Sequence, residues 1–579
     1  MTIPVIYKSY RIDTPHKGFW DYAMINDLFE GRMWKRSGYD FEIFEQINLK
    51  DSAVDGECGI LIIPARSHAN PEDVEKINKD IEHLSGVILM LIGDEEGVFP
   101  YLDIKHPNCK IYAMSPQLDQ KDVIDFPLPN GYTPGLEKID QEVPQRSEID
   151  KNDWFFAGQV THNRRKACVK ELRKLKKGCL IETDGFSKGI DQKEYYKIMA
   201  QSKVALCPSG AVIPDTFRLY EALECASFPI VEEVSPKGAM AGYWQFLFNE
   251  DELPFKIVKT WKGVEGQIQY FSDTYPKFQN VVSAWWMGYK RRLYYQVIED
   301  FKEVLIRAGK EGFLNSLPLD DCGRSVDGCM TVLIPTSPTK LHPDTSLIEV
   351  TIESVREKLP HSEIILMVDG VREEQQALTP AYNEYIRRLL WLTNHKYKNI
   401  LPVLFESHQH QANMTRECLR LVKTDYIMFV EHDTPLCEEI PFGGIVGFLA
   451  TGRANLVRLN HEAFILDEHK KFLLDKVPVD LVFNKQSMKL SRTFQWSQRP
   501  HVARRGFYEY ILDKYFSEDS KTMIEDRMHG VVMSKCLARG LPGWNEFKIW
   551  IYTPEGDQKR SYHTDGRGTE SKFTETFKF

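Results

Sequence analysis

One stretch of the chain constrains its fold and chemistry more than any other. A run of apolar and aromatic residues from 426 to 430 leads directly into Glu431, His432 and Asp433 before Pro435 ends it. A short β-rich run closed by a breaker predicts a buried strand of a parallel sheet. The two acids then lie at the carboxyl end of that strand, where open α/β sheets bind ligands. Two hard oxygen ligands there predict a site for Mg²⁺ or Mn²⁺ that bridges to a substrate phosphate.

A Glu-x-Asp pair also has a simpler interpretation, a polar strand end that only caps the following turn. Short motifs recur by chance, so the pair taken alone favours this simpler interpretation. The surrounding residues have to decide between the two.

Length and composition limit the class of protein. A chain of 579 residues exceeds one hydrophobic core, so about two to four domains are expected. The eleven cysteines occur singly without a CxxC pair, which predicts reduced thiols rather than disulfides or a zinc site. The longest apolar run, residues 86–93, is too short to span a bilayer. No basic region followed by an apolar stretch opens the chain, so a cytoplasmic protein is expected.

Charge is distributed unevenly. The net charge is −9, and because residues 330–579 are roughly balanced, the acidity lies in the first 329 residues. This disfavours a general nucleic-acid binder, which needs clustered Lys and Arg. Residues 485–505 are the exception, with six basic residues and no acid. This basic stretch is interpreted equally well as a solvated loop or as an anion-binding site.

The first third of the chain reads as alternating strands and helices. Strands are predicted at residues 5–7, 59–64, 87–92 and 110–114, with helical stretches such as 71–84 between them. This alternation predicts a parallel sheet covered on both faces by helices. Residues 125–135 are rich in Pro and Gly and predict a linker between two lobes.

A second α/β lobe follows the linker. Residues 154–158 predict a strand that ends in Gly158, and Arg164 and Arg165 then open a helix. A strand, a glycine turn and basic residues at a helix N-terminus form a layout that holds an anion.

A later helix carries Asp215, Arg218 and Glu221 at a spacing of three, which places them on one broad face. Arg218 is then positioned to meet a diphosphate, and Glu221 to accept both hydroxyls of a ribose. The competing interpretation is a set of surface salt bridges.

Residues 154–233 resemble the donor-binding lobe of exostosin-like glycosyltransferases of the GT-B fold. The resemblance rests on the strand 154–158 with its two arginines, on VALCPSG at 204–210 and on DTFRLYEALECASFPIV at 215–231, where Cys225-Ala226-Ser227 replaces the usual glycine. It implies an acceptor lobe at 1–130 and a donor lobe at 131–318. The donor-binding residues that it implies are Gly158, Arg164, Arg165, Ser209, Asp215, Arg218 and Glu221. It names no catalytic base, and Asp13, His16 and Asp94 near predicted strand ends are expected to be structural.

A long amphipathic helix at 280–310 precedes a polar boundary at 317–329, after which the α/β pattern restarts. Strands are predicted at 331–336, 363–370 and 399–405, and helices at 346–359 and 411–422, the last of which carries Arg416. Asp369 ends the second of these strands and is positioned to accept a hydrogen bond from a nucleobase.

This second half resembles the GT-A fold of the large inverting glycosyltransferase family that includes cellulose and hyaluronan synthases. The matching motifs, in order, are VLIPT ending at Thr336, VDG with Asp369, VEHD with Glu431 in place of the usual Asp, MIEDR with Glu525 and Asp526, and a late His563. The resemblance implies that Thr336, Asp369, Arg416, Glu431, Asp433 and Arg499 bind the donor. It further implies that Asp433, Glu431 and His563 bind a metal, and that Asp526, paired with Glu525, is the general base of an inverting transfer.

The sequence therefore predicts an α/β chain with a GT-B module followed by a GT-A module at 330–579. The predicted function is a bifunctional glycosyltransferase that uses UDP-, GDP- or dTDP-linked sugars and a glycan or glycoconjugate acceptor, with Mn²⁺ or Mg²⁺ only at the second site. Two alternatives stay open: a non-catalytic binding module in the first half, or sugar transfer to hydroxylated bases of modified, phage-type DNA. A hydrolase or dehydrogenase is disfavoured because no G-x-S-x-G or G-x-G-x-x-G follows a predicted strand. The sugar, the linkage and the oligomeric state stay undetermined.

Overall fold

The computed structural model describes residues 2–10, 20–34, 40–45, 49, 56–185, 189–310, 326–461, 465, 467–475, 477–553 and 558–564. The described residues form two compact units. The first unit holds the described residues up to 310 together with Leu390–Lys398, and the second holds the rest. Asp13 and His16 lie outside the described residues.

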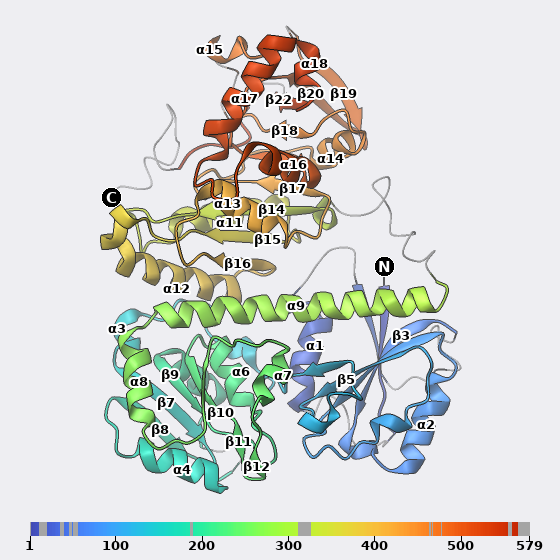
Figure 1. Cartoon of the computed structure of the whole chain (residues 1–579), viewed down its shortest axis with the longest axis vertical. Helices are drawn as coiled ribbons and strands as arrows, with labels where there is room; N and C mark the ends of the chain where they lie inside the picture. The colour runs from blue at the N-terminus through green and yellow to red at the C-terminus, as the bar shows by residue number, and fades with distance from the viewer. Residues whose placement is uncertain are drawn as a thin grey trace. The chain divides into compact units, whose positions relative to one another are not determined.

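The first unit begins with a six-stranded parallel sheet in the order β2-β1-β3-β4-β5-β6 (Figure 1). The strands are β1 (Thr2–Tyr7), β2 (Asp40–Glu45), β3 (Cys58–Pro64), β4 (Gly86–Ile92), β5 (Cys109–Met114) and β6 (Phe126–Leu128). The helices of this lobe are α1 (Ala23–Phe29) and α2 (Pro71–Ile81). Every residue of β3 and β4 is buried, as expected for central strands covered on both faces.

The second lobe of this unit is a five-stranded parallel sheet in the order β13-β10-β9-β7-β8. Its strands are β7 (Asn152–Gly158), β8 (Gly178–Glu182), β9 (Ser202–Cys207), β10 (Phe228–Glu232) and β13 (Lys256–Val258). A small antiparallel pair, β11 (Val234–Ser235) and β12 (Gly238–Ala239), stands apart from the sheet. The helices are α3 (Arg146–Ile149), α4 (Asn163–Leu172), α5 (Gln192–Ala200), α6 (Phe217–Glu224), α7 (Tyr243–Phe248), α8 (Val264–Asp273) and α9 (Lys277–Arg307).

The long helix α9 joins the two lobes of the first unit. In Figure 1 it runs along both of them, and it packs against β3, β4 and β5 as well as α6 and β10. Near its end, Val304 O accepts a hydrogen bond from Asn108 Nδ2 at 2.9 Å. Near its start, Trp286 Nε1 donates to Glu224 Oε1 at 2.7 Å. The tryptophans of this helix therefore belong to the core, as its amphipathic pattern predicts.

The second unit is built on a nine-stranded mixed sheet in the order β16-β15-β14-β17-β21-β18-β22-β20-β19. The strands are β14 (Met330–Thr336), β15 (Ile364–Val368), β16 (Ile400–Leu404), β17 (Tyr426–Phe429), β18 (Leu456–Arg458), β19 (Val479–Phe483), β20 (Gln486–Arg492), β21 (His501–Arg504) and β22 (Ile549–Tyr552). The first four in space are mutually parallel, and β21 is antiparallel to both β17 and β18.

Its helices are α11 (Ser346–Lys358), α12 (Thr379–His395), α13 (His410–Leu419), α14 (Phe442–Ala450), α15 (Asp467–Lys470), α16 (Arg505–Tyr515), α17 (Ile524–Arg539) and α18 (Leu541–Trp544). The last residues of α12 group with the first unit, because Asn394 Nδ2 and His395 Nε2 donate to Glu224 Oε2 and Glu224 O, both at 2.9 Å. No helix in the described parts of the chain is long and apolar enough to cross a membrane.

The predicted α/β class is confirmed, with two parallel sheets in the first half and a third sheet in the second. One local expectation is corrected. Residues 485–505 are not a single loop, since β20 and β21 occupy most of this basic stretch. Of the six basic residues, Lys489 and Arg492 lie on β20, Arg504 lies on β21 and Arg505 begins α16.

Candidate functional site

A cavity of about 520 Å³ lies in the second unit where β14, β15 and β17 end. It is lined by Pro335, Thr336, Ser337, Asp369, Arg372, His410, Gln411, Met414, Glu431, His432, Asp433, Arg458, His469, Gln495, Ser497, Arg499, Met523, Glu525 and His563. Parallel strands bring their carboxyl ends to one edge, so the polar residues that follow them meet there. This is the edge at which the acids after residue 430 were predicted to lie.

The Asp369 carboxylate anchors one wall of this second-unit cavity. Its oxygens accept hydrogen bonds from the backbone N–H groups of Gln409 at 2.7 Å and His410 at 3.1 Å, and His408 Nδ1 lies 2.8 Å from Oδ2. Asp369 therefore holds the start of α13 against the end of β15. Thr336, which ends β14, donates to or accepts from the Tyr385 hydroxyl at 2.9 Å.

Asp433 and His563 meet although they are far apart in the sequence. The backbone N–H of Thr564 donates to Asp433 O at 3.0 Å, which draws the late segment against the end of β17. His563 Nδ1 then lies 3.6 Å from Asp433 Oδ2, and Glu431 lines the same cavity.

Asp433, His563 and Glu431 could hold a divalent metal only together with a substrate. Among the described residues no group of three His, Cys, Asp or Glu side chains is placed to hold an ion. Mg²⁺ sites, however, are often completed by substrate phosphates on one or two protein carboxylates. Asp433 with His563, and Glu431 beside them, would supply such a partial site, which a donor diphosphate completes.

Two acids of α17 are separated by the fold. Glu525 lines the cavity, and its Oε2 accepts the backbone N–H of Gln498 at 2.8 Å. Asp526, predicted as the general base, is exposed and does not line the cavity, although its charge reaches His410. The structure thus favours Glu525 over Asp526 as the acid that faces a substrate.

Arg416 does not line the cavity, so its predicted contact with the donor is corrected. Its guanidinium donates to Leu512 O at 2.9 Å, Phe516 O at 3.0 Å and Ser517 O at 3.2 Å. These carbonyls lie at the end of α16 and just after it, where a basic side chain interacts favourably with the end of a helix.

The sequence prediction missed Arg458, which ends β18 inside the cavity. Its side chain is 5% exposed, and Nη1 donates to Gln495 O at 3.1 Å. Burial and the neighbouring Arg499 charge lower the pKa of Arg458 to about 10. The only available signal in the sequence was a basic residue at the end of a short apolar run.

A second cavity of about 660 Å³ lies in the first unit, where β7 ends and α6 begins. Of the predicted donor-binding residues, Gly158, Arg165, Arg218 and Glu221 line this first-unit cavity. Arg218 donates from Nε and Nη2 to Ala157 O at 3.1 and 2.7 Å, while its buried Nη1 has no hydrogen-bond partner among the described residues.

Arg165 lies beside Arg218 in the same cavity. Its Nε is also buried without a partner, and burial together with the Arg218 charge lowers the pKa of Arg165 to about 10. Glu221 accepts hydrogen bonds from Thr133 Oγ1 at 2.8 Å and from the Tyr195 hydroxyl at 2.7 Å. Arg165 and Arg218 thus each have one buried guanidinium nitrogen without a hydrogen-bond partner among the described residues, an arrangement that suits an anion.

Three other predicted residues hold the fold instead. Arg164 pairs with the buried Glu232, which also accepts the backbone N–H of Ser209 at 2.9 Å. Asp215 accepts from the Tyr220 hydroxyl at 2.7 Å and from the Asn130 backbone N–H at 2.8 Å. None of these three lines the first-unit cavity. Internal partners thus hold the side chains of Arg164 and Asp215, whereas the buried Ser209 Oγ has no hydrogen-bond partner among the described residues. The predicted contacts of these three residues with a donor stay predictions.

Glu95 is a further residue that the sequence prediction missed. It follows β4 in the first lobe, and its charge raises the pKa of Arg165 in the second lobe. Burial and the neighbouring Asp21 and Asp215 raise the pKa of Glu95 to about 7. The adjacent Asp94 is structural as expected, since it accepts the backbone N–H groups of Val98 and Phe99 at 3.0 and 3.1 Å.

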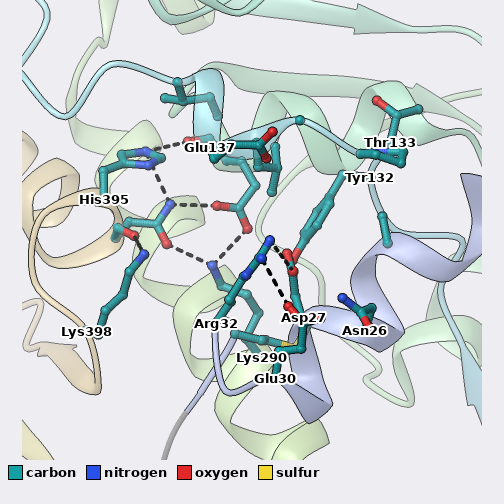
Figure 2. A pocket seen from close by; sticks show the side chains of 18 of the residues that line it. Asn26, Asp27, Glu30, Arg32, Tyr132, Thr133, Glu137, Lys290, His395 and Lys398 are labelled. Atoms are coloured by element: carbon teal, nitrogen blue, oxygen red, sulfur yellow. Dashed lines mark hydrogen bonds and ion pairs between the residues drawn. The ribbon is translucent and has the colours of Figure 1, made fainter. Parts of the chain in front are cut away.

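A third cavity, of about 890 Å³, lies on the other side of residues Thr133 and Pro134 in the first unit. Figure 2 shows Arg32 beside Asp27, with Lys290 close to them. The Tyr132 hydroxyl donates to Asp27 Oδ2 at 2.9 Å, Arg32 pairs with Asp27 at 3.6 Å, and Lys290 Nζ donates to Glu224 Oε1 at 2.8 Å. The charges of this cavity are therefore matched internally, unlike those of the other two.

Comparison with known proteins supports a glycosyltransferase relationship for the first unit. Residues 152–306 match the family model of the RXYLT1 C-terminal domain. Ribitol-5-phosphate xylosyltransferase 1 of Danio rerio is 27% identical over 201 residues, which is 31% of this chain and 45% of that protein. The match thus spans about half the length of this relative. The matched family segment contains Gly158, Arg165, Arg218 and Glu221.

Solved structures give weaker similarities. Staphylococcus aureus TarS 1–349 in complex with UDP-GlcNAc aligns with a TM-score of 0.26 and 13% identity over 43% of this chain and 62% of that chain. Mannosyltransferase PcManGT of Pyrobaculum calidifontis, in complex with GDP-Man and Mn²⁺, aligns with a TM-score of 0.25 and 13% identity over 39% and 57%. TM-scores this low establish no shared fold, so the description of the fold comes from the strand order.

Proposed function

We propose that the chain is a glycosyltransferase with a nucleotide-sugar site in each unit. The observation that carries the proposal is the pair Arg165 and Arg218, with unused buried donors, inside the segment that matches the family model. A diphosphate supplies the two negative charges that such a pair needs. A pentose donor is the first to test at this site, because the relative is named a xylosyltransferase.

In the first-unit cavity each residue has its own role in binding the donor. Arg165 and Arg218 hold the diphosphate leaving group, and Gly158 lets the backbone approach it. Glu221, fixed by Thr133 and Tyr195, retains acceptor capacity for ribose hydroxyls.

At the second site Asp433 and His563, with Glu431, would hold Mn²⁺ or Mg²⁺ together with the donor. Such an ion, when bound, neutralises charge on the diphosphate. Glu525 accepts the proton of an acceptor hydroxyl. The oxygen of that hydroxyl bonds to the anomeric carbon as the bond from this carbon to the diphosphate breaks. A single displacement with one base and no protein nucleophile inverts the configuration at that carbon.

The test is donor cleavage by the full chain, screened over UDP-, GDP-, dTDP- and CMP-linked sugars with Mn²⁺ and with EDTA. We expect one metal-dependent and one metal-independent activity, each increased by an acceptor. Donor binding without turnover at the first site, on any acceptor, would make that unit a binding module. The absence of both binding and turnover for every donor would overturn the proposal.

A further inference from the structure

Arg458 is a buried cation whose charge is not matched inside the second-unit cavity. Its Nε is buried without a hydrogen-bond partner among the described residues, and none of their ion pairs includes Arg458. Its Nη1 bonds are to neutral oxygens, Gln495 O at 3.1 Å and Gln495 Oε1 at 3.4 Å. A guanidinium in this state is costly to bury unless an anion reaches it.

Arg499 is a second cation in the part of the cavity that Arg458 lines. Arg499 lines the cavity, and its charge lowers the pKa values of both Arg458 and His461. Glu525 is the carboxylate whose charge acts on Arg458, but no ion pair joins the two. The Arg458–Arg499 wall is therefore a site for an anion from outside the chain.

The position of this wall indicates which substrate carries the anion. The partial metal site formed by Asp433 and His563 already provides for the donor diphosphate. Glu525 lines the cavity, its Oε2 accepts the backbone N–H of Gln498, the residue before Arg499, at 2.8 Å, and its charge acts on Arg458. A base must lie within hydrogen-bond reach of the hydroxyl that it deprotonates, so the acceptor lies on the Arg458 side.

We propose that Arg458 and Arg499 bind a phosphate or carboxylate group of the acceptor, so that the second unit transfers sugar only to acidic acceptors. This inference rests on the proposed transferase activity of the second unit. Both guanidinium groups have the planar donor geometry that suits bidentate contacts with either acidic group.

The test is calorimetric titration of the full chain carrying Arg218→Gln, which weakens the anion site of the first unit. Glycerol 3-phosphate, glycerate and glycerol serve as probes that share a vicinal diol and differ at the third carbon, which carries a phosphate ester, is a carboxylate, or carries a hydroxyl. We expect one or both acids to bind and glycerol not to bind.

Arg458→Gln and Arg499→Gln should each weaken acid binding about tenfold or more, from loss of charge-assisted hydrogen bonds. Arg453→Gln, an exposed arginine of the preceding loop, is the matched control and should change nothing.

A second set of titrations contains saturating Mn²⁺ with UDP or GDP. Acid binding that persists beside the nucleotide supports a separate acceptor subsite. Displacement of the acid by nucleotide and Mn²⁺ would overturn the proposal and make the wall part of the donor site. Unchanged acid binding in both variants would also overturn it. Arg499 is only half-buried, so its variant keeps the test valid if Arg458→Gln fails to fold. Retained acid binding in a chain without any donor turnover would count against the transferase activity alone.

Discussion

Helix α17 turns the adjacent acids Glu525 and Asp526 in different directions. Glu525 and Asp526 are adjacent acids in the first turn of α17, about 100° apart around the helix axis. That rotation directs Glu525 into the cavity, while Asp526 is exposed. The backbone N–H of Gln498 fixes Glu525 at 2.8 Å, so its position does not depend on a substrate.

We expect Glu525→Gln to lower sugar transfer at the second site by about 100-fold or more, the usual contribution of a general base. Asp526→Asn should change the rate by no more than about threefold. The measurement is initial transfer rates with Mn²⁺, together with the affinity for the donor, which both variants should retain. The reverse order of effects would return the role of the base to Asp526.

The end of β7 and the start of α6 position Arg218 in the first-unit cavity. β7 ends at Gly158, whose φ of +147° lies in the region that favours glycine. A Cβ at this position would meet the Arg218 guanidinium, which comes from α6. The Arg218 guanidinium thus occupies the space beside the end of β7, and only glycine at position 158 leaves this space open.

We expect Gly158→Ala to lower the metal-independent activity at least tenfold, because Arg218 must leave its place and Ala157 O then loses its donor. The chain should also become less stable in urea unfolding. Gly266→Ala is the control, since it lies in α8 with no atom near the added methyl group. It should keep full activity and gain up to about 1 kcal/mol of stability. Equal activity of both variants would contradict the role given to Gly158.

Helices α6, α9 and the end of α12 meet at a buried ionic cluster in the first unit. Burial raises the pKa of Glu224, but Lys290 and His395 outweigh it and hold the pKa at about 2. Burial lowers the pKa of His395 to about 4, with Glu224 opposing this change and Lys290 and Lys398 adding to it. The native state therefore holds His395 neutral.

Stability should consequently fall as the pH drops from about 6.5 to about 4, since only the unfolded state binds a proton at His395 in this range. The loss amounts to at most about 3 kcal/mol, reduced by the partial exposure of the ring. We expect His395→Gln to flatten this part of the profile, measured by urea unfolding between pH 4.5 and 6.5. His361→Gln, at an exposed histidine, should leave the slope unchanged. The same slope in both variants would contradict the assignment.

At the scale of the whole molecule, the described residues place one arginine-lined cavity in each of the two compact units, and we propose that each binds a donor diphosphate. The first uses arginines at the end of a parallel strand, and the second adds acids and an imidazole suited to a metal. These are different solutions to holding a diphosphate, so we expect them to act independently.

Arg218→Gln should abolish metal-independent transfer and leave the metal-dependent transfer unchanged, whereas Asp433→Asn should do the opposite. The double variant should lack both, and its donor affinities should follow from the single variants. Glu439→Gln, an exposed acid six residues after Asp433, is the control. The two-site proposal fails if either single variant abolishes both activities.

The sequence by itself determined the α/β class, most strands and the sheet edge at which the polar residues after these strands line a cavity. These properties follow from local causes: apolar runs of strand length, alternation with helices, and polar residues directly after a strand. For this reason Asp369, Glu431, Asp433 and Gly158 were found from the residues around them.

Only the tertiary structure decided which polar side chains have internal partners. Arg164 and Arg165 are adjacent in the sequence, yet the first pairs with Glu232 and the second faces a cavity. Arg416 and Arg458 were likewise indistinguishable from their neighbours, but α16 supplies carbonyls to the first and nothing charged pairs with the second among the described residues. A buried charge is stabilised by groups that come from distant parts of the chain, so its role depends on contacts that local sequence does not encode.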